Sequence, residues 1–180
     1  MKKGIRITLV TVAICLVGLL FFVIQGMNEK RIRQLTCAGV KVEFTDDFKF
    51  VTAKDVEGYL SKEYGAYIGQ RLDSVNLLKI ENILDGKSAI LKAEAYTTPD
   101  GYLNVKIRQR EPVVRFQEDN NGYYTDEKGF LFPLQRNYTS MVPIIDGSLP
   151  LNIERGYKGE PKTEAEREWL AEVIMLVNYM

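Results

Sequence analysis

The chain has 180 residues, with 24 basic and 24 acidic side chains, two cysteines and no histidine. The absence of histidine removes the usual general base and the usual zinc ligand, which excludes most serine and cysteine catalytic arrangements. Without the three basic residues before the first apolar segment, 21 basic residues face 24 acidic ones, and this charge of −3 does not fit a nucleic-acid-binding surface.

Residues 7–24 form an apolar segment without a single charge. As a helix with a rise of 1.5 Å per residue, this segment spans about 27 Å, close to the thickness of the hydrocarbon core of a bilayer. We therefore predict a transmembrane helix over residues 7–24. The side chains expected to anchor it are Ile7, Leu9, Val12, Leu16, Leu19, Phe22 and Ile24.

The charges around this segment predict its orientation. Lys2, Lys3 and Arg6 lie in a short tail, residues 1–6, which the positive-inside rule places in the cytoplasm. Three basic residues between positions 30 and 33 reduce the asymmetry. A cleaved signal peptide is the alternative, but no small-x-small site follows the segment. A lipoprotein anchor needs a small residue before its cysteine, whereas Cys15 follows isoleucine in mid-segment.

Residues 25–38 are mostly polar and are predicted to form a juxtamembrane stalk. Apolar and polar residues then alternate from position 40 to 45, which is typical of a half-buried strand. Thr52, with Asp55 three positions later, predicts the capped start of a helix. A second helix is expected to start near Ser74 or Asn76, with Leu77, Ile80 and Leu84 on one face and Gly86 at its end.

Two further strands are predicted at residues 89–98 and 102–111. The Pro99-Asp100-Gly101 turn between them favours a β-hairpin, because proline fixes φ and glycine allows a positive φ. Leu91, Ala93 and Ala95 are expected on the apolar face of the first of these strands. Residues 39–111 thus form a β-α-α-β-β domain in which two helices cover one face of a sheet.

From Pro112 onward the pattern changes to short strands, expected at 113–116, 123–125, 130–134 and 142–145. Thr163 and Glu166 then predict a capped helix at the end of the chain. Residues 112–180 are expected to form an antiparallel, β-rich second domain that ends in this helix. The overall class is α+β.

Several short motifs occur in a specific order. They are VKIRQREPVVRF at 105–116, YYTDEKG at 123–129, PL at 133–134 and VPIIDG at 142–147. In this order, behind an apolar segment, they resemble the FtsQ/DivIB family of bacterial cell-division proteins. The resemblance implies a POTRA domain followed by a β domain on the periplasmic side of the inner membrane, at the division septum.

The same resemblance implies partners rather than substrates. They are FtsB/DivIC-like and FtsL-like division proteins and, through these, the septal peptidoglycan synthase. The β domain of the family continues beyond its helix, whereas this sequence stops at Met180. We therefore expect a truncated β domain. The alternative is a POTRA-containing accessory of outer-membrane protein assembly or secretion, which usually carries several POTRA units or a following barrel.

The sequence predicts no cofactor, no metal and no enzymatic activity. Cys37 is interpreted as a buried or idle thiol, and residues 117–128 lack the first and last ligands of a calcium loop. Five residues are predicted to lie at the domain seam or, less specifically, to contact a partner: Pro112, Arg115, Tyr123, Tyr124 and Asp126. The two tyrosines point to opposite faces of a strand, so one ring is expected in the core and the other against a neighbouring strand or exposed.

Overall fold

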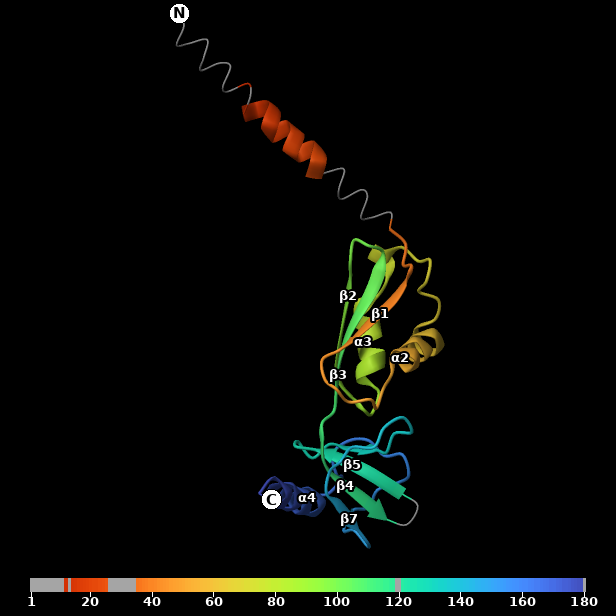
Figure 1. The fold of residues 1–180 in the computed structure, drawn as a ribbon, viewed down its shortest axis with the longest axis vertical. Coiled ribbons are helices and arrows are strands. Elements are labelled where there is room, and N and C mark those ends of the chain that lie inside the picture. The colour runs from red at the N-terminus through yellow and green to blue at the C-terminus, as the bar shows by residue number, and fades with distance from the viewer. Residues whose placement is uncertain (1–11, 13, 26–34, 119–120, 180) are drawn as a thin grey trace, which may run out of the picture.

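The computed structural model describes residues 12, 14–25, 35–118 and 121–179. Two domains follow one another along the long axis of the molecule, as Figure 1 shows. The first contains β1 (Gly39–Phe44), α2 (Ala53–Tyr59), the helical turns η1 (Leu60–Tyr64) and η2 (Leu72–Ser74), α3 (Leu77–Asp85), β2 (Ile90–Thr97) and β3 (Tyr102–Gln109). The second contains β4 (Pro112–Glu118), β5 (Asn121–Asp126), β6 (Leu131–Pro133), β7 (Ile144–Asp146) and α4 (Glu164–Asn178).

Residue 12 and residues 14–25 are helical, and their large apolar side chains are exposed. Leu16, Leu19, Phe22 and Ile24 of the predicted anchor lie in the helix of residues 14–25, and Val12 is also helical. Two further anchor residues and the three basic topology residues lie outside the described residues: Ile7, Leu9, Lys2, Lys3 and Arg6. Within the described part of the chain, no helix is both long enough and apolar enough to cross a membrane.

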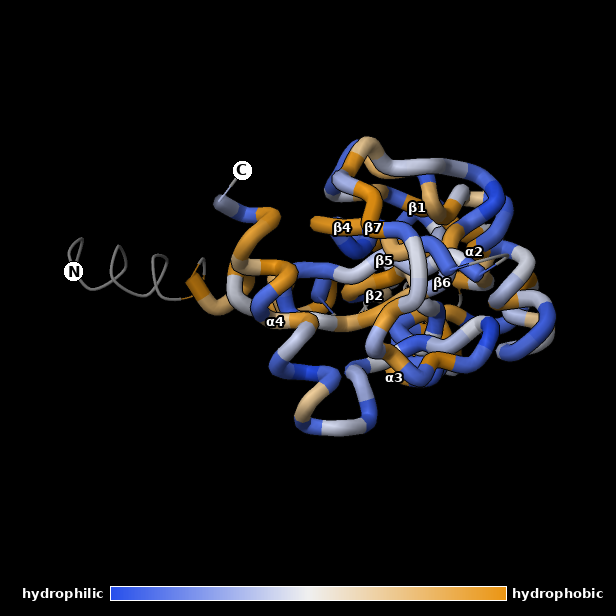
Figure 2. The backbone as a smooth tube through the Cα atoms, turned by 90° about the horizontal axis from the view of Figure 1, so that it is seen from below, coloured by the Kyte–Doolittle hydropathy of each residue, from blue (hydrophilic) through white to orange (hydrophobic). Residues whose placement is uncertain are grey.

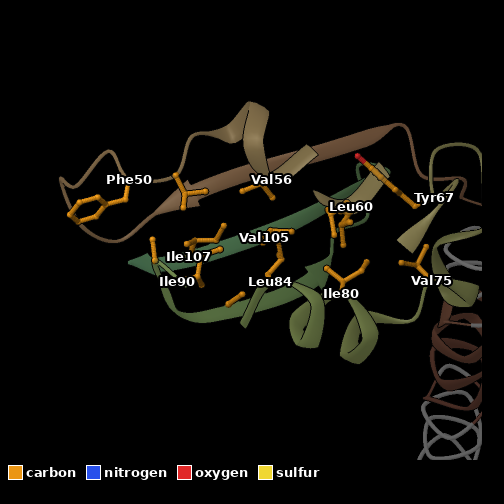
Figure 3. Close-up of a cluster of buried hydrophobic side chains, with 14 of the residues drawn as sticks. Phe50, Val56, Leu60, Tyr67, Val75, Ile80, Leu84, Ile90, Val105 and Ile107 are labelled. Atoms are coloured by element: carbon orange, nitrogen blue, oxygen red, sulfur yellow. The ribbon is translucent and has the colours of Figure 1, made fainter. Parts of the chain in front are cut away.

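The sheet of the first domain has the strand order β1-β3-β2. β1 runs parallel to β3, and β2 pairs with β3 as the predicted antiparallel hairpin. Gly101 has a φ of 89°, the positive value that the turn requires. Apolar side chains of the strands, α2 and α3 fill the space between the sheet and the helices, and Figure 3 shows several of them, including Val56, Ile80 and Val105.

Both helices of this domain begin where the sequence predicts. The Thr52 hydroxyl accepts the N–H of Asp55, and the Asp55 carboxylate accepts the N–H of Thr52, which completes a capping box. Asn76 caps α3 through the N–H of Lys79. Gly86 ends α3, but in a right-handed conformation with φ −68°, so a left-handed glycine cap is not used here.

Two details of the first domain differ from the predicted pattern. A register shift between Ile90 and Lys92 puts Ile90 fully in the core, while Leu91 is only partly buried. Such a bulge inserts a residue and breaks the strict alternation of faces. Residues 35–38, which the sequence assigns to the stalk, join the domain: Thr36 forms a bridge with Arg71, and Cys37 is buried.

The second domain has a sheet with the order β6-β5-β4-β7. β4, β5 and β6 are antiparallel, as predicted, but β7 pairs with β4 in parallel. The prediction of a wholly antiparallel sheet is therefore wrong at β7. After β6 the chain passes to the opposite edge of the sheet, and a crossover of this kind permits a parallel pair.

Helix α4 covers one face of the second sheet. Thr163 and Glu166 form the predicted capping box, and a Glu166 carboxylate oxygen also accepts the N–H of Asn152. The buried side of α4 packs with Val114, Phe116 and Leu131 of the sheet in a cluster of its own. In Figure 2 the tube of α4 alternates between hydrophobic and hydrophilic stretches, as expected of a helix with one buried side.

Candidate functional site

An aromatic cluster joins the two domains. Phe50, in the loop between β1 and α2, is 1% exposed. Its ring centroid lies 5.6 Å from that of Tyr124, 6.0 Å from that of Phe132 and 5.0 Å from that of Tyr138, all of which follow the seam in sequence. Because Tyr124 and Phe132 belong to the same hydrophobic cluster as the core of the first domain, this core continues across the seam.

An ion pair lies beside this cluster. Nη1 of Arg110 donates to Oδ2 of Asp126 at 2.7 Å, and the two side chains are only 12% and 10% exposed. The guanidinium also lies over the ring of Phe130, 3.5 Å from its centroid. The other Asp126 oxygen accepts the backbone N–H groups of Lys128 and Phe130. One oxygen of Asp126 therefore stabilises the β5–β6 turn, and the other binds this turn to Arg110 at the end of the first domain.

A buried glutamine organises the loop that carries Phe50. Nε2 of Gln109 donates to Oδ1 of Asp46 and to the carbonyl oxygen of Phe48, and Oε1 accepts the N–H of Val51. The backbone N–H of Gln109 donates to the second Asp46 oxygen. Each polar atom of the Gln109 amide thus has a partner, as a buried amide requires. Gln109 is not among the residues predicted from the sequence.

The five predicted seam residues all lie in β4 or β5, but they do not form one exposed surface. Pro112 is buried at the start of β4, and Nη2 of Arg115 donates to Gln117 within the same strand. Tyr123 and Tyr124 are both buried on opposite faces of β5: the hydroxyl of Tyr123 donates to the carbonyl oxygen of Glu154, and that of Tyr124 accepts the N–H of Ser140. Neither ring offers an exposed surface to a partner. Burial raises the pKa of Tyr123.

The edges of the two sheets are the remaining candidates for protein contacts. At the edge of β2, the N–H of Ala93 donates to Oδ1 of Asp85 at 2.6 Å, and the N–H of Ala95 donates to Oε1 of Glu81 at 2.8 Å. Both carboxylates come from α3. Helix α3 therefore occupies the donors that a strand added to β2 would need.

The second sheet is closed at one edge as well. The N–H and carbonyl groups of Leu131 in β6 exchange hydrogen bonds with those of Gly159. At the other edge β7 has only three residues, beside the exposed side chains of Met141 and Ile144. The strands β1, β2, β6 and β7 lie at sheet edges. Among them, β1 is the longest whose central residues form no hydrogen bond on their outer side with another segment of the described chain.

Replacing Asp85 by alanine is expected to destabilise the chain by about 1–3 kcal/mol, because it leaves the buried amide of Ala93 without an acceptor. Asp85→Asn keeps a carbonyl acceptor and is expected to cost clearly less. Urea denaturation of both variants measures the difference. Equal losses would mean that the ion pair of Asp85 with Lys92, and not the amide contact, is responsible.

Asp100, in the exposed turn between β2 and β3, has a strongly lowered pKa. The hydrogen bond from Lys41, together with that from Thr98, lowers the pKa of Asp100 to about 2. Lys41 Nζ lies 2.6 Å from Oδ2 of Asp100 and 3.9 Å from the centroid of the Tyr102 ring. The pair spans β1 and the hairpin and is about half exposed.

This lowered pKa predicts a specific acid dependence. Since the folded-state pKa of Asp100 lies below its ordinary value of 3.8, its contribution to stability is complete above about pH 4 and is lost as the pH falls toward 2. We expect Asp100→Asn to have a lower urea midpoint than the wild type at pH 7 and to converge with it near pH 2. A difference that is constant from pH 7 to pH 2 would contradict this assignment.

A groove of about 540 Å³ lies beside α4. Leu170, Ala171, Ile174 and Met175 give it an apolar wall, and the β5–β6 turn and Pro161 form the other side. Charged residues of both signs line its rim. Within the described residues no cluster of three or more histidine, cysteine, aspartate or glutamate side chains is arranged to hold a metal ion.

Residues 35–108 match the family described as the POTRA-like domain. The match begins in the segment before β1, which forms hydrogen bonds with the loop at residues 69–72. It ends within β3, just before the seam between the two domains. No curated protein matches the chain. The first domain is therefore a POTRA-like domain, followed by a sheet with a helix on one face, and a POTRA-like domain suggests a protein-interaction scaffold.

Proposed function

We propose that this chain is a non-enzymatic, single-pass membrane scaffold of the bacterial division machinery. The observation that carries the proposal is the order of its parts. A POTRA-like domain follows an apolar helix and continues, with only two residues between β3 and β4, into a β domain that ends in a helix. This is the order that the resemblance to the FtsQ/DivIB family implies.

The helix of residues 14–25 supports the anchoring part of the proposal. Its large apolar side chains are exposed and have no protein layer over them among the described residues. Lipid is the solvent that such a surface favours. With Lys2, Lys3 and Arg6 in the cytoplasm, both domains lie on the periplasmic side of the inner membrane. Confinement to the membrane plane raises the effective concentration of partners that share the membrane.

The proposed partners are FtsB/DivIC-like and FtsL-like proteins, which connect the chain to the septal peptidoglycan synthase. The chain supplies surfaces for such contacts rather than reactive groups. Its two hydrophobic clusters are buried, whereas β1, β7 and the groove beside α4 are accessible to another protein. Strand edges bind through main-chain hydrogen bonds, and grooves bind through apolar side chains.

A fluorescent fusion of the full chain tests the proposal. We expect the fusion to gather at midcell before constriction and its depletion to give filaments without septa. A matched variant with Leu16→Arg and Leu19→Arg should leave the membrane and lose midcell position, because each charge at the centre of a bilayer costs about 3 kcal/mol or more. Uniform membrane fluorescence together with normal septation after depletion would contradict the division assignment.

A POTRA-containing accessory of outer-membrane protein assembly or secretion is the second candidate, because the POTRA-like match is common to both functions. It predicts a different result from the same depletion. Outer-membrane barrel proteins would fall in amount while septa still form. Normal barrel levels in filamenting cells would leave the division scaffold as the better supported function.

A further inference from the structure

The outer edge of β1 presents regularly spaced backbone groups. The N–H of Thr45 donates to the carbonyl oxygen of Ile107 at 3.0 Å, which fixes the side of the strand that faces β3. By the alternation of a strand, the N–H and C=O groups of Val40, Val42 and Phe44 then point away from β3. None of these groups has a hydrogen bond to another segment of the described chain.

The side chains along this edge divide between two faces. Val40, Val42 and Phe44 are partly buried and pack against the core on the helix side of the sheet. Lys41 and Glu43 alternate with these residues along the strand, so they project from the opposite face, and both are exposed. When a second copy of the strand Val-Lys-Val-Glu-Phe runs in the opposite direction, each apolar residue lies opposite an apolar residue and the lysine lies opposite the glutamate.

We propose that two copies of this chain pair through their β1 edges, antiparallel and centred on Val42. In this register Val42 faces Val42 of the second copy, and Val40 faces Phe44. These outward-pointing positions exchange about six main-chain hydrogen bonds. Lys41 then lies opposite Glu43 of the second copy, and Glu43 opposite Lys41, in the closely spaced positions where side chains interact most. The two POTRA-like sheets become one continuous sheet.

Charge complementarity selects a second copy as the occupant. A lysine on an edge strand ordinarily discourages pairing, but the Glu43 of a reversed copy offsets it at both contacts. Glu43 has no ion pair or hydrogen bond in the described part of the chain. The partner of Lys41 within the chain, Asp100, lies in an exposed ion pair, and a lysine ammonium has three N–H donors, so Lys41 can bind Asp100 and Glu43 of the second copy together.

The other edges do not fit such a pair. Asp85 and Glu81 cap the amides of β2, Gly159 pairs with β6, and β7 has only three residues.

The two-fold axis that relates the copies of an antiparallel pair is perpendicular to the sheet. Both membrane anchors therefore reach one bilayer when the sheet lies along the membrane surface. This pairing is a property of the purified chain and does not depend on the division assignment.

Sedimentation equilibrium of the full chain in detergent micelles tests the pairing. The wild type is expected to be a dimer. Lys41→Glu and Glu43→Lys each place like charges opposite one another twice, so each should raise the dissociation constant about tenfold or more. The double variant K41E/E43K restores opposite charges and should dissociate like the wild type. Lys92→Glu makes the same charge change on the capped β2 strand and should have no effect.

Mixing the two single variants gives a second, independent result. A heterodimer of K41E with E43K has opposite charges at both contacts, so the mixture should associate more tightly than either variant alone. This also shows that neither variant is misfolded. A monomeric wild type at its highest concentration overturns the pairing, as does a mixture that stays monomeric. A dimer that all four variants leave unchanged assigns association to another surface and likewise overturns it.

Discussion

Replacement of Phe50 by alanine is expected to lower the free energy of unfolding by about 3–5 kcal/mol, the cost of removing a fully buried ring from a packed core. The ring contacts three aromatic side chains of the second domain, so the cavity opens at the seam. The domains should then lose their common core. We expect calorimetry to show two transitions where the wild type shows one.

Phe50→Leu is the matched control for this prediction. Leucine keeps most of the apolar volume, and substitutions that retain volume are tolerated far better than truncation. It should therefore cost clearly less and keep a single transition. A single transition in Phe50→Ala, even at a lower temperature, would mean that Arg110 and Asp126 hold the domains together without the ring.

Replacement of Arg110 by methionine is expected to cost about 3–5 kcal/mol, because the Asp126 carboxylate then remains buried without its counter-charge. Asp126→Asn removes the charge but keeps an oxygen for the N–H groups of Lys128 and Phe130. The double variant R110M/D126N should therefore be more stable than R110M alone. Urea denaturation of the two single variants and the double variant gives the coupling energy directly. Strictly additive losses would contradict a functional ion pair at the seam.

The helix starts and the hairpin could be predicted because their causes are local. A capping box needs only Thr52 and Asp55, or Thr163 and Glu166, at a fixed spacing. The β2–β3 turn needs only a glycine with a positive φ at position 101. These features depend on residues within four positions of one another, so a single sequence contains all of the information.

The segments that cover the sheet edges and the contacts across the seam could not be predicted in the same way, because the residues that make them lie far apart in the chain. The sequence pattern indicates that Asp85 and Glu81 are ordinary solvent-exposed residues of α3, and only folding brings them to the amides of β2. The parallel placement of β7 depends on where a crossover ends. Gln109 did leave a signal: it follows Leu103, Val105 and Ile107 at the same spacing of two, a polar residue at an inward position.

The direct passage from β3 into β4 has a mechanical consequence. Only Arg110 and Glu111 separate the two strands, and Figure 1 shows the chain running straight from one into the other. The guanidinium of Arg110 donates a hydrogen bond to Asp126 at the β5–β6 turn of the second sheet. The amide of the neighbouring Gln109 donates to the carbonyl oxygen of Phe48, in the loop that carries Phe50. A rotation of the first sheet is therefore expected to carry the second sheet with it, because the two-residue connection and the Arg110–Asp126 ion pair leave little freedom between the two sheets.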